Sequence, residues 1–130
     1  MLEKTRGIVL RSTSYSDTSV IVKIYTEDFG VLSFLVKGAK RKNASIKANL
    51  FGPLSMLDLS IYKKEKKNLQ ILKEATIETH FVSISADPAK TSILFFLNEV
   101  LIKCLQDDEV NIELFNFLHE SLTALETAEK

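Results

Sequence analysis

The chain has 130 residues and a mass of 14.7 kDa, enough for one domain, or a small domain with an appendage, to bury a core without disulfides. Hydrophobic residues make up 45% and charged residues 26% of the sequence, which excludes a disordered or fibrous protein. The longest apolar run, 93–97, has five residues, whereas a membrane-spanning helix needs roughly 20. Because the first thirty residues also lack the hydrophobic stretch of a secretory signal, we expect a cytoplasmic protein without membrane contact.

The formal net charge of zero hides a strong asymmetry along the chain. Residues 1–80 carry 14 Lys and Arg against 8 Asp and Glu, a net charge of +6, and residues 81–130 carry 3 against 9, a net charge of −6. A basic part attracts polyanions such as nucleic acid over long distances. A solvated surface whose two halves attract each other explains the same pattern. We predict a boundary near residue 80, where the spacing of apolar residues changes too.

Short alternating or apolar segments in residues 1–80 predict five β-strands. In chain order they are 6–10, 19–26, 31–37, 54–62 and 69–78. Gly30 lies in the turn after the second segment, where it is free to take positive φ, and Gly38 ends the third. The polar connection 39–49 leaves room for a short helical turn. Five short strands favour a small barrel.

Beyond residue 85 the apolar spacing becomes that of helices. Asp87 followed by Pro88 predicts a helix start, and we expect this helix to end near residue 106. A second helix then follows, with Asp108 or Asn111 as its N-cap. Apolar stripes are predicted on the first helix (Ile93, Phe96, Leu97, Val100, Leu101 and Cys104) and on the second (Phe115, Leu118, Leu122 and Leu125). Because Leu94, Phe95 and Ile102 widen the first stripe, we expect it to be buried against the barrel, with a protein interface as the alternative. The predicted fold class is mainly β with α: a five-stranded OB-type β-barrel (residues 1–80) followed by an antiparallel helical hairpin (81–130).

The sequence contains no pattern typical of catalysis or metal binding. Cys104 is the only cysteine, and neither His80 nor His119 has partners at metal-ligand spacing. Gly-x-Ser-x-Gly, P-loop and dinucleotide-binding patterns are missing as well. We therefore predict a protein that is not an enzyme and that needs no cofactor or metal.

Nine of the 14 cations in residues 1–80 lie in two loops. In a five-stranded OB barrel, strands 2 and 3 form the binding face, and the loop between strands 4 and 5 flanks it. One group follows the third predicted strand, and the other lies between the fourth and fifth. These groups are Lys37, Lys40, Arg41, Lys42 and Lys47, and Lys63, Lys64, Lys66 and Lys67.

The second predicted strand places Ile21, Lys23 and Tyr25 opposite its inward-facing residues Val20, Val22 and Ile24. A cation and an aromatic ring on an exposed face can neutralise phosphates and stack bases. Tyr25 packing half-buried in the barrel wall explains the same pattern equally well.

Three segments, in this order and spacing, resemble the amino-terminal domain of the RecO family of bacterial recombination mediators. They are 7–19 (GIVLRSTSYSDTS), 25–30 (YTEDFG) and 37–41 (KGAKR). The resemblance covers residues 1–80, and residues after Pro88 look like the start of that family's second, helical domain. It implies an OB barrel that binds single- and double-stranded DNA, anneals complementary strands and, with RecR and single-strand-binding protein, loads RecA without hydrolysing nucleotide.

By position, Lys37, Lys40, Arg41 and Lys42 match the family's basic loop after strand 3, and Arg11 matches the residue that closes strand 1. The chain is markedly shorter than a complete member, so the four-cysteine zinc site of many members would lie beyond Lys130. We predict a non-enzymatic DNA-binding module of DNA repair at the nucleoid. Its candidate DNA-binding residues are Arg11, Lys23, Tyr25, Lys37, Lys40, Arg41, Lys42, Lys47, Lys63, Lys64, Lys66 and Lys67. The alternatives are a platform that docks a protein partner through the acidic helical part, and an RNA-binding barrel.

Overall fold

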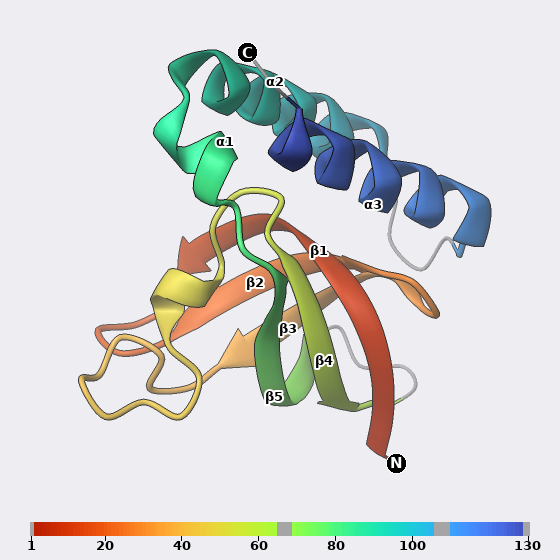
Figure 1. The fold of residues 1–130 in the computed structure, drawn as a ribbon. Coiled ribbons are helices and arrows are strands. Elements are labelled where there is room, and N and C mark those ends of the chain that lie inside the picture. Colours follow the sequence, from red (N-terminus) through yellow and green to blue (C-terminus); the bar gives the residue numbers. More distant parts are fainter. Residues whose placement is uncertain (1, 65–68, 106–109, 129–130) are drawn as a thin grey trace.

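The computed structural model describes residues 2–64, 69–105 and 110–128. In these residues five strands close into a barrel with the order β1-β2-β3-β5-β4, which confirms the predicted fold class (Figure 1). All neighbouring strands are antiparallel except β3 and β5, which are parallel. The strands are β1 (Leu2–Ser14), β2 (Val20–Thr26), β3 (Gly30–Val36), β4 (Met56–Tyr62) and β5 (Leu69–Thr79).

Strand β1 is much longer than the predicted segment 6–10, because its two ladders are offset along the strand. Its residues 2–8 pair with β4 and its residues 7–14 with β2, with a bulge between Val9 and Arg11. Gly7 lies where the two ladders overlap. A Cβ atom there would stand 2.5 Å from Ile24 Cγ2 and 2.7 Å from Leu59 Cδ1. The close approach of three strands therefore requires glycine at this position.

Turn chemistry sets the ends of β2 and β3 as predicted. Gly30 has φ = 70° and Gly38 has φ = 72°, values that residues with a Cβ rarely adopt. The side chain of Thr26 steadies the first turn: Oγ1 donates to the carbonyl of Gly30 (2.7 Å) and accepts from the N–H of Phe29 (3.1 Å). The connection after β3 contains one short 3₁₀ helix, η1 (Ala48–Leu50).

The barrel is filled by the inward-facing side chains of all five strands, and Val20, Val22 and Ile24 point inward as predicted. Burying such apolar side chains is the main source of stability in a domain of this size. The fully buried members of this core include Val9, Val22, Ile24, Phe34, Leu57 and Ile61.

In the described part of the chain after the barrel there are three helices: α1 (Val82–Ala86), α2 (Pro88–Cys104) and α3 (Ile112–Thr127). The start of α2 is as predicted, since Asp87 Oδ1 accepts from the N–H of Ala89 at 3.0 Å. Asn111 is the N-cap of α3, and its Oδ1 accepts from the N–H of Leu114 at 3.0 Å. The single turn α1 has no counterpart in the sequence prediction.

The predicted buried stripe of α2 is wrong for most of its residues. Ile93 (52%), Phe96 (72%) and Val100 (38%) are exposed, as is Cys104. Leu97 is partly buried, and of the predicted stripe only Leu101 is buried. The face that packs inward carries Lys90, Leu94, Asn98 and Leu101.

Polar contacts explain why this face of α2 is the buried one. Asn98 Nδ2 donates to the backbone carbonyl of Leu10 on β1 at 2.9 Å. Lys90 Nζ donates to Ser83 Oγ at 2.6 Å and to the carbonyl of Ala128 after α3. Because α2 is apolar on nearly all sides, these specific partners, and not hydropathy alone, determine its orientation.

The helices cover one side of the barrel, above the strands in Figure 1. The outward-facing residues Ile8, Tyr25 and Met56 join the helices in a second core. In α3 the predicted stripe is confirmed, with Phe115, Leu118 and Leu122 buried and Leu125 partly buried. The outer surface of the barrel is therefore divided into a part under the helices and a part that faces solvent.

Candidate nucleic-acid interface

The basic connection after β3 is fixed to the turn between β1 and β2. The backbone N–H of Lys40 donates to the carbonyl of Thr18 (3.0 Å), and that of Gly38 donates to Ser19 Oγ (3.2 Å). The ammonium of Lys40 donates to Ser14 Oγ and to the carbonyl of Ser16. Two segments far apart in sequence thus form one ordered end of the barrel, on the left in Figure 1.

These contacts give the cations of the connection different roles. Lys37, Arg41, Lys42 and Lys47 are exposed. Lys40 is exposed too, but its ammonium is engaged with the β1–β2 turn. We therefore assign Lys40 to holding the loop in place and the other four to solvent-facing positive charge.

The strand register continues this basic end onto the outer face of the sheet. Directly paired residues point to the same side of a sheet. Arg11 pairs with Lys23, which pairs with Ser33, and Ser33 pairs with Leu69. A polar row with two cations therefore runs across β1, β2 and β3 and ends beside Leu69 on β5.

A second, more apolar row lies beside the polar one. Thr13 pairs with Ile21, Ile21 with Leu35, and Leu35 with Ile71. Ile21 and Leu35 are partly exposed and Ile71 is 52% exposed. Aliphatic side chains flanked by cations suit a ligand with flat apolar groups and negative charges, which is the chemistry of a nucleic-acid strand.

Two hollows open along this face. One, of about 410 Å³, is lined by Tyr15, Thr18, Ser19, Leu35, Lys37, Gly38 and Arg41. The other, of about 400 Å³, includes Leu35, Lys37, Ile46, Ile71 and Lys73 in its lining. Leu35 and Lys37 belong to both, so the hollows are adjacent along the sheet.

The second lysine group lies at the opposite end of β2 from the first. Lys63 Nζ stands 5.5 Å from the centroid of the Phe29 ring, in the turn between β2 and β3. The backbone of Lys64 is tied to the buried side chain of Gln70, whose amide both accepts and donates at 2.8 Å. The predicted site residues Lys66 and Lys67 lie outside the described residues.

Tyr25 does not belong to the exposed face, which corrects the interpretation of this residue as a base-stacking one. It is 1% exposed, its ring lies 5.7 Å from that of Phe115, and its hydroxyl donates to the carbonyl of Asn111 at 3.2 Å. The alternation of β2 correctly predicted that Tyr25 points out of the barrel, but α3 covers this part of the sheet. Tyr25 therefore packs against a helix, and it is more deeply buried than the half-buried packing that the sequence also allowed.

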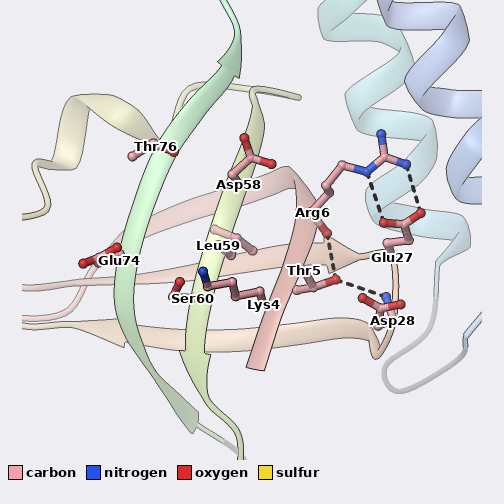
Figure 2. Close-up of a pocket in the computed structure, with 10 residues that line it drawn as sticks. All are labelled: Lys4, Thr5, Arg6, Glu27, Asp28, Asp58, Leu59, Ser60, Glu74 and Thr76. Atoms are coloured by element: carbon pink, nitrogen blue, oxygen red, sulfur yellow. Dashed lines mark hydrogen bonds and ion pairs between the residues drawn. The ribbon is translucent and has the colours of Figure 1, made fainter. Parts of the chain in front are cut away.

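A groove on the other side of β1 has a contrasting charge. Figure 2 shows its lining, in which carboxylates from three elements surround Lys4 and Arg6 in a space of about 460 Å³. The carboxylates are Glu27, Asp28, Asp58 and Glu74. Because carboxylates outnumber cations in this lining, its charge disfavours polyanions.

Arg6 links this groove to the helices. Its Nε and Nη2 donate to the two carboxylate oxygens of Glu27 at 3.1 and 2.9 Å, and its guanidinium lies 5.4 Å from the Phe115 ring centroid. The hydrogen bond from Arg6 lowers the pKa of Glu27 below its ordinary value. Beside it, His119 Nε2 lies 2.6 Å from Glu78 Oε2, so this histidine belongs to the contact between α3 and β5.

Among the described residues, no three His, Cys, Asp or Glu side chains gather closely enough to hold a metal ion. Nor does any helix there have the length and apolar character needed to cross a bilayer.

A comparison with protein families identifies this barrel. Residues 1–81 match the family model described as "Recombination protein O N terminal". The chain belongs to the RecO family. The resemblance found in the segments 7–19, 25–30 and 37–41 is thereby confirmed.

Relatives named "DNA repair protein RecO" match along almost the whole chain. The protein of Phocaeicola vulgatus is 39% identical over 130 residues, which is 100% of this chain and 54% of the relative. Those of Bacteroides fragilis (40% over 127 residues) and Flavobacterium johnsoniae (37% over 124) cover 98% and 95% of this chain and 52% of each relative. The chain thus spans about half the length of these RecO proteins.

One exposed residue of this RecO barrel escaped the sequence analysis. Tyr15 is 59% exposed and lines the hollow that contains Lys37 and Arg41. The available signal for a binding residue was an aromatic side chain within a Ser-rich turn, because solvent exposure of a large ring does not stabilise the fold. Tyr15 lies in this hollow because the basic loop, 22 residues or more further along the chain, folds back beside it. The periodicity of the sequence does not predict that contact.

Proposed function

We propose that this chain is a DNA-binding module of DNA repair that acts without catalysing a reaction. The observation that supports it best is the distribution of charge: Arg11, Lys23, Lys37 and Arg41 lie along one solvent-facing side of the barrel, and carboxylates line the groove on another. Cations along one side of a protein neutralise phosphates of any base sequence, and their binding releases counterions from the nucleic acid.

Membership of the RecO family extends this proposal to the cellular task. Residues 1–80 would hold single- or double-stranded DNA and keep complementary strands close enough to anneal. Residues 81–130 would serve contacts with RecR and single-strand-binding protein, and so the loading of RecA. The work would be done at the nucleoid, in the cytoplasm.

The test is a titration of a labelled single-stranded oligonucleotide followed by fluorescence anisotropy at several salt concentrations. If about five phosphates are neutralised, the slope of log K against log salt is about −3.5 for single strands. Arg41→Glu should weaken binding and make the slope shallower by about 0.7. A slope near zero for the unaltered chain would refute the electrostatic mechanism.

The matched control is Lys4→Glu, which changes the net charge equally but lies in the acidic groove. It should leave the affinity and the slope close to those of the unaltered chain. Lys40 is left in place in both variants because it holds the loop. A duplex and an RNA of equal length, used as competitors, measure the preference among the three nucleic acids.

A protein-docking function is the second candidate, and the exposed side of α2 favours it. Ile93, Phe96 and Val100 lie there with 52%, 72% and 38% of their surface exposed. Exposed apolar patches often mark protein interfaces. Absence of DNA binding even at low salt would favour this function over the first.

A further inference from the structure

We propose that the hollow beside Tyr15 holds one unpaired nucleotide of a single DNA strand, with the base stacked on the Tyr15 ring and its phosphate between Lys37 and Arg41. This inference rests on the DNA-binding function proposed above and names the residue that would distinguish single strands from duplex.

The hollow combines the parts that a nucleotide site needs. Its volume of about 410 Å³ lies within the range of small-molecule sites. Tyr15 supplies an aromatic ring that is 59% exposed, while Lys37 and Arg41 supply two exposed cations in the same lining. Stacking on an aromatic ring accepts any base, and cations bind any phosphate, so the site is expected to ignore sequence.

The walls of the hollow are held in place before any ligand arrives. Tyr15 N–H donates to the carbonyl of Ser19 at 2.9 Å, and Arg41 N–H donates to the carbonyl of Gly38 at 3.0 Å. Ser19, which is 7% exposed, accepts from the Gly38 N–H through its side chain. The first bond lies within the β1–β2 turn and the second within the basic loop, and the bond from Gly38 to Ser19 joins the two segments. A preorganised site loses less conformational entropy on binding.

The neighbouring hollow extends the proposed binding surface for the DNA strand along the sheet. It shares Leu35 and Lys37 with the Tyr15 hollow and continues over Ile71 to Lys73. Its lining again combines aliphatic side chains with cations. A strand leaving Tyr15 therefore meets further surface for bases and phosphates across β3 and β5.

A duplex cannot use the Tyr15 ring in this way. Its bases are paired and stacked inside the helix, and extruding one costs a few kcal/mol. The cations remain available to duplex phosphates, so the duplex should bind through charge alone. Tyr15 would thus contribute only where the base is unpaired.

The experiment measures dissociation constants for three probes of equal length: oligodeoxythymidylate, an abasic phosphodeoxyribose strand and a duplex. Tyr15→Ala should weaken binding of the thymidylate strand about 5- to 150-fold. Affinity for the abasic strand and the duplex should change less than about twofold. Tyr15→Phe keeps the ring and should restore binding of the thymidylate strand. Phe96→Ala, which removes an exposed ring from the far side of α2, should affect none of the three.

Each other outcome is decisive. If Tyr15→Ala weakens all three probes equally, the residue acts through the shape of the loop and the stacking role is wrong. If it changes none of them while Arg41→Glu weakens all, the DNA-binding function stands and the Tyr15 site is refuted. If the unaltered chain binds no probe at low salt, the proposed function itself fails.

Discussion

The hydrogen bond from Asn98 to β1 provides a sharp test of how the helices are attached to the barrel. Asn98 is 8% exposed, and its amide donates to the carbonyl of Leu10, a residue that is 2% exposed. Leu10 lies in the bulge of β1, where the pairing with β2 is interrupted between Val9 and Arg11. We propose to replace the amide by an apolar group of similar volume, in Asn98→Leu.

The expected loss follows from the state of the Leu10 carbonyl. The substitution leaves this acceptor buried without its donor, which costs about 1–3 kcal/mol of the free energy of unfolding. Leucine fills nearly the same space, so a cavity contributes little. In a chain of this size each kcal/mol lowers Tm by about 3–5 °C, so we expect a fall of about 3–15 °C.

Thermal and urea unfolding followed by circular dichroism measure both quantities. The control is Glu99→Leu, the same new side chain at the adjacent exposed position, which should shift the free energy of unfolding by no more than about 0.5 kcal/mol. If Asn98→Leu is as stable as the control, the carbonyl has another donor, and the hydrogen bond does not determine which face of α2 is buried.

Two further predictions concern the barrel itself. Gly7→Ala should lower the free energy of unfolding by about 1–3 kcal/mol, because its Cβ would lie 2.5 Å from Ile24 and 2.7 Å from Leu59; a urea midpoint equal to that of the unaltered chain would contradict this. Glu27 has its pKa lowered by the hydrogen bond from Arg6, so its stabilising effect is complete above the unfolded pKa and is lost as pH falls through the lower folded pKa. The stability difference between the unaltered chain and Glu27→Gln, measured in urea, should therefore shrink between about pH 5 and pH 3, and a constant difference would refute the assigned ion pair.

The strands were predictable because a barrel buries one side of each of them. Val20, Val22 and Ile24 alternate with Ile21, Lys23 and Tyr25, and the polar groups of Lys23 and Tyr25 mark the second set as the outer face. The length of β1 was not predictable in this way. Its first half pairs with β4 and its second half with β2, and the pattern of one strand does not show how far its two ladders are offset.

The orientation of α2 was beyond the sequence for a related reason. Apolar residues lie on several sides of this helix, so more than one stripe fits the helical period. The face that is buried includes Lys90 and Asn98, two polar residues that hydropathy assigns to solvent. Their partners, Ser83 and Leu10, come from other elements, and only the folded chain brings them together.

The candidate site shows the same division. Lysine and arginine positions predicted a basic loop, and four of its five cations are free of the contacts that hold Lys40. Periodicity turned Tyr25 outward but could not tell which outward residues the helices cover. Tyr15 was missed because its neighbours in the hollow come from a loop after β3.

The parallel pairing of β3 with β5 has a consequence for binding. Among the described residues, it joins the three residue pairs 33–35 with 69–71, whereas β2 and β3 share seven. Parallel pairing is slightly less stable per residue than antiparallel pairing, so amide hydrogens of this pair should exchange early in the native state. Leu35 on β3 and Ile71 on β5 form one pair of this ladder. A DNA strand lying across both residues would bind only the closed barrel and would therefore stabilise the closed state by mass action. Ligand occupancy and barrel closure would then be two measures of one equilibrium.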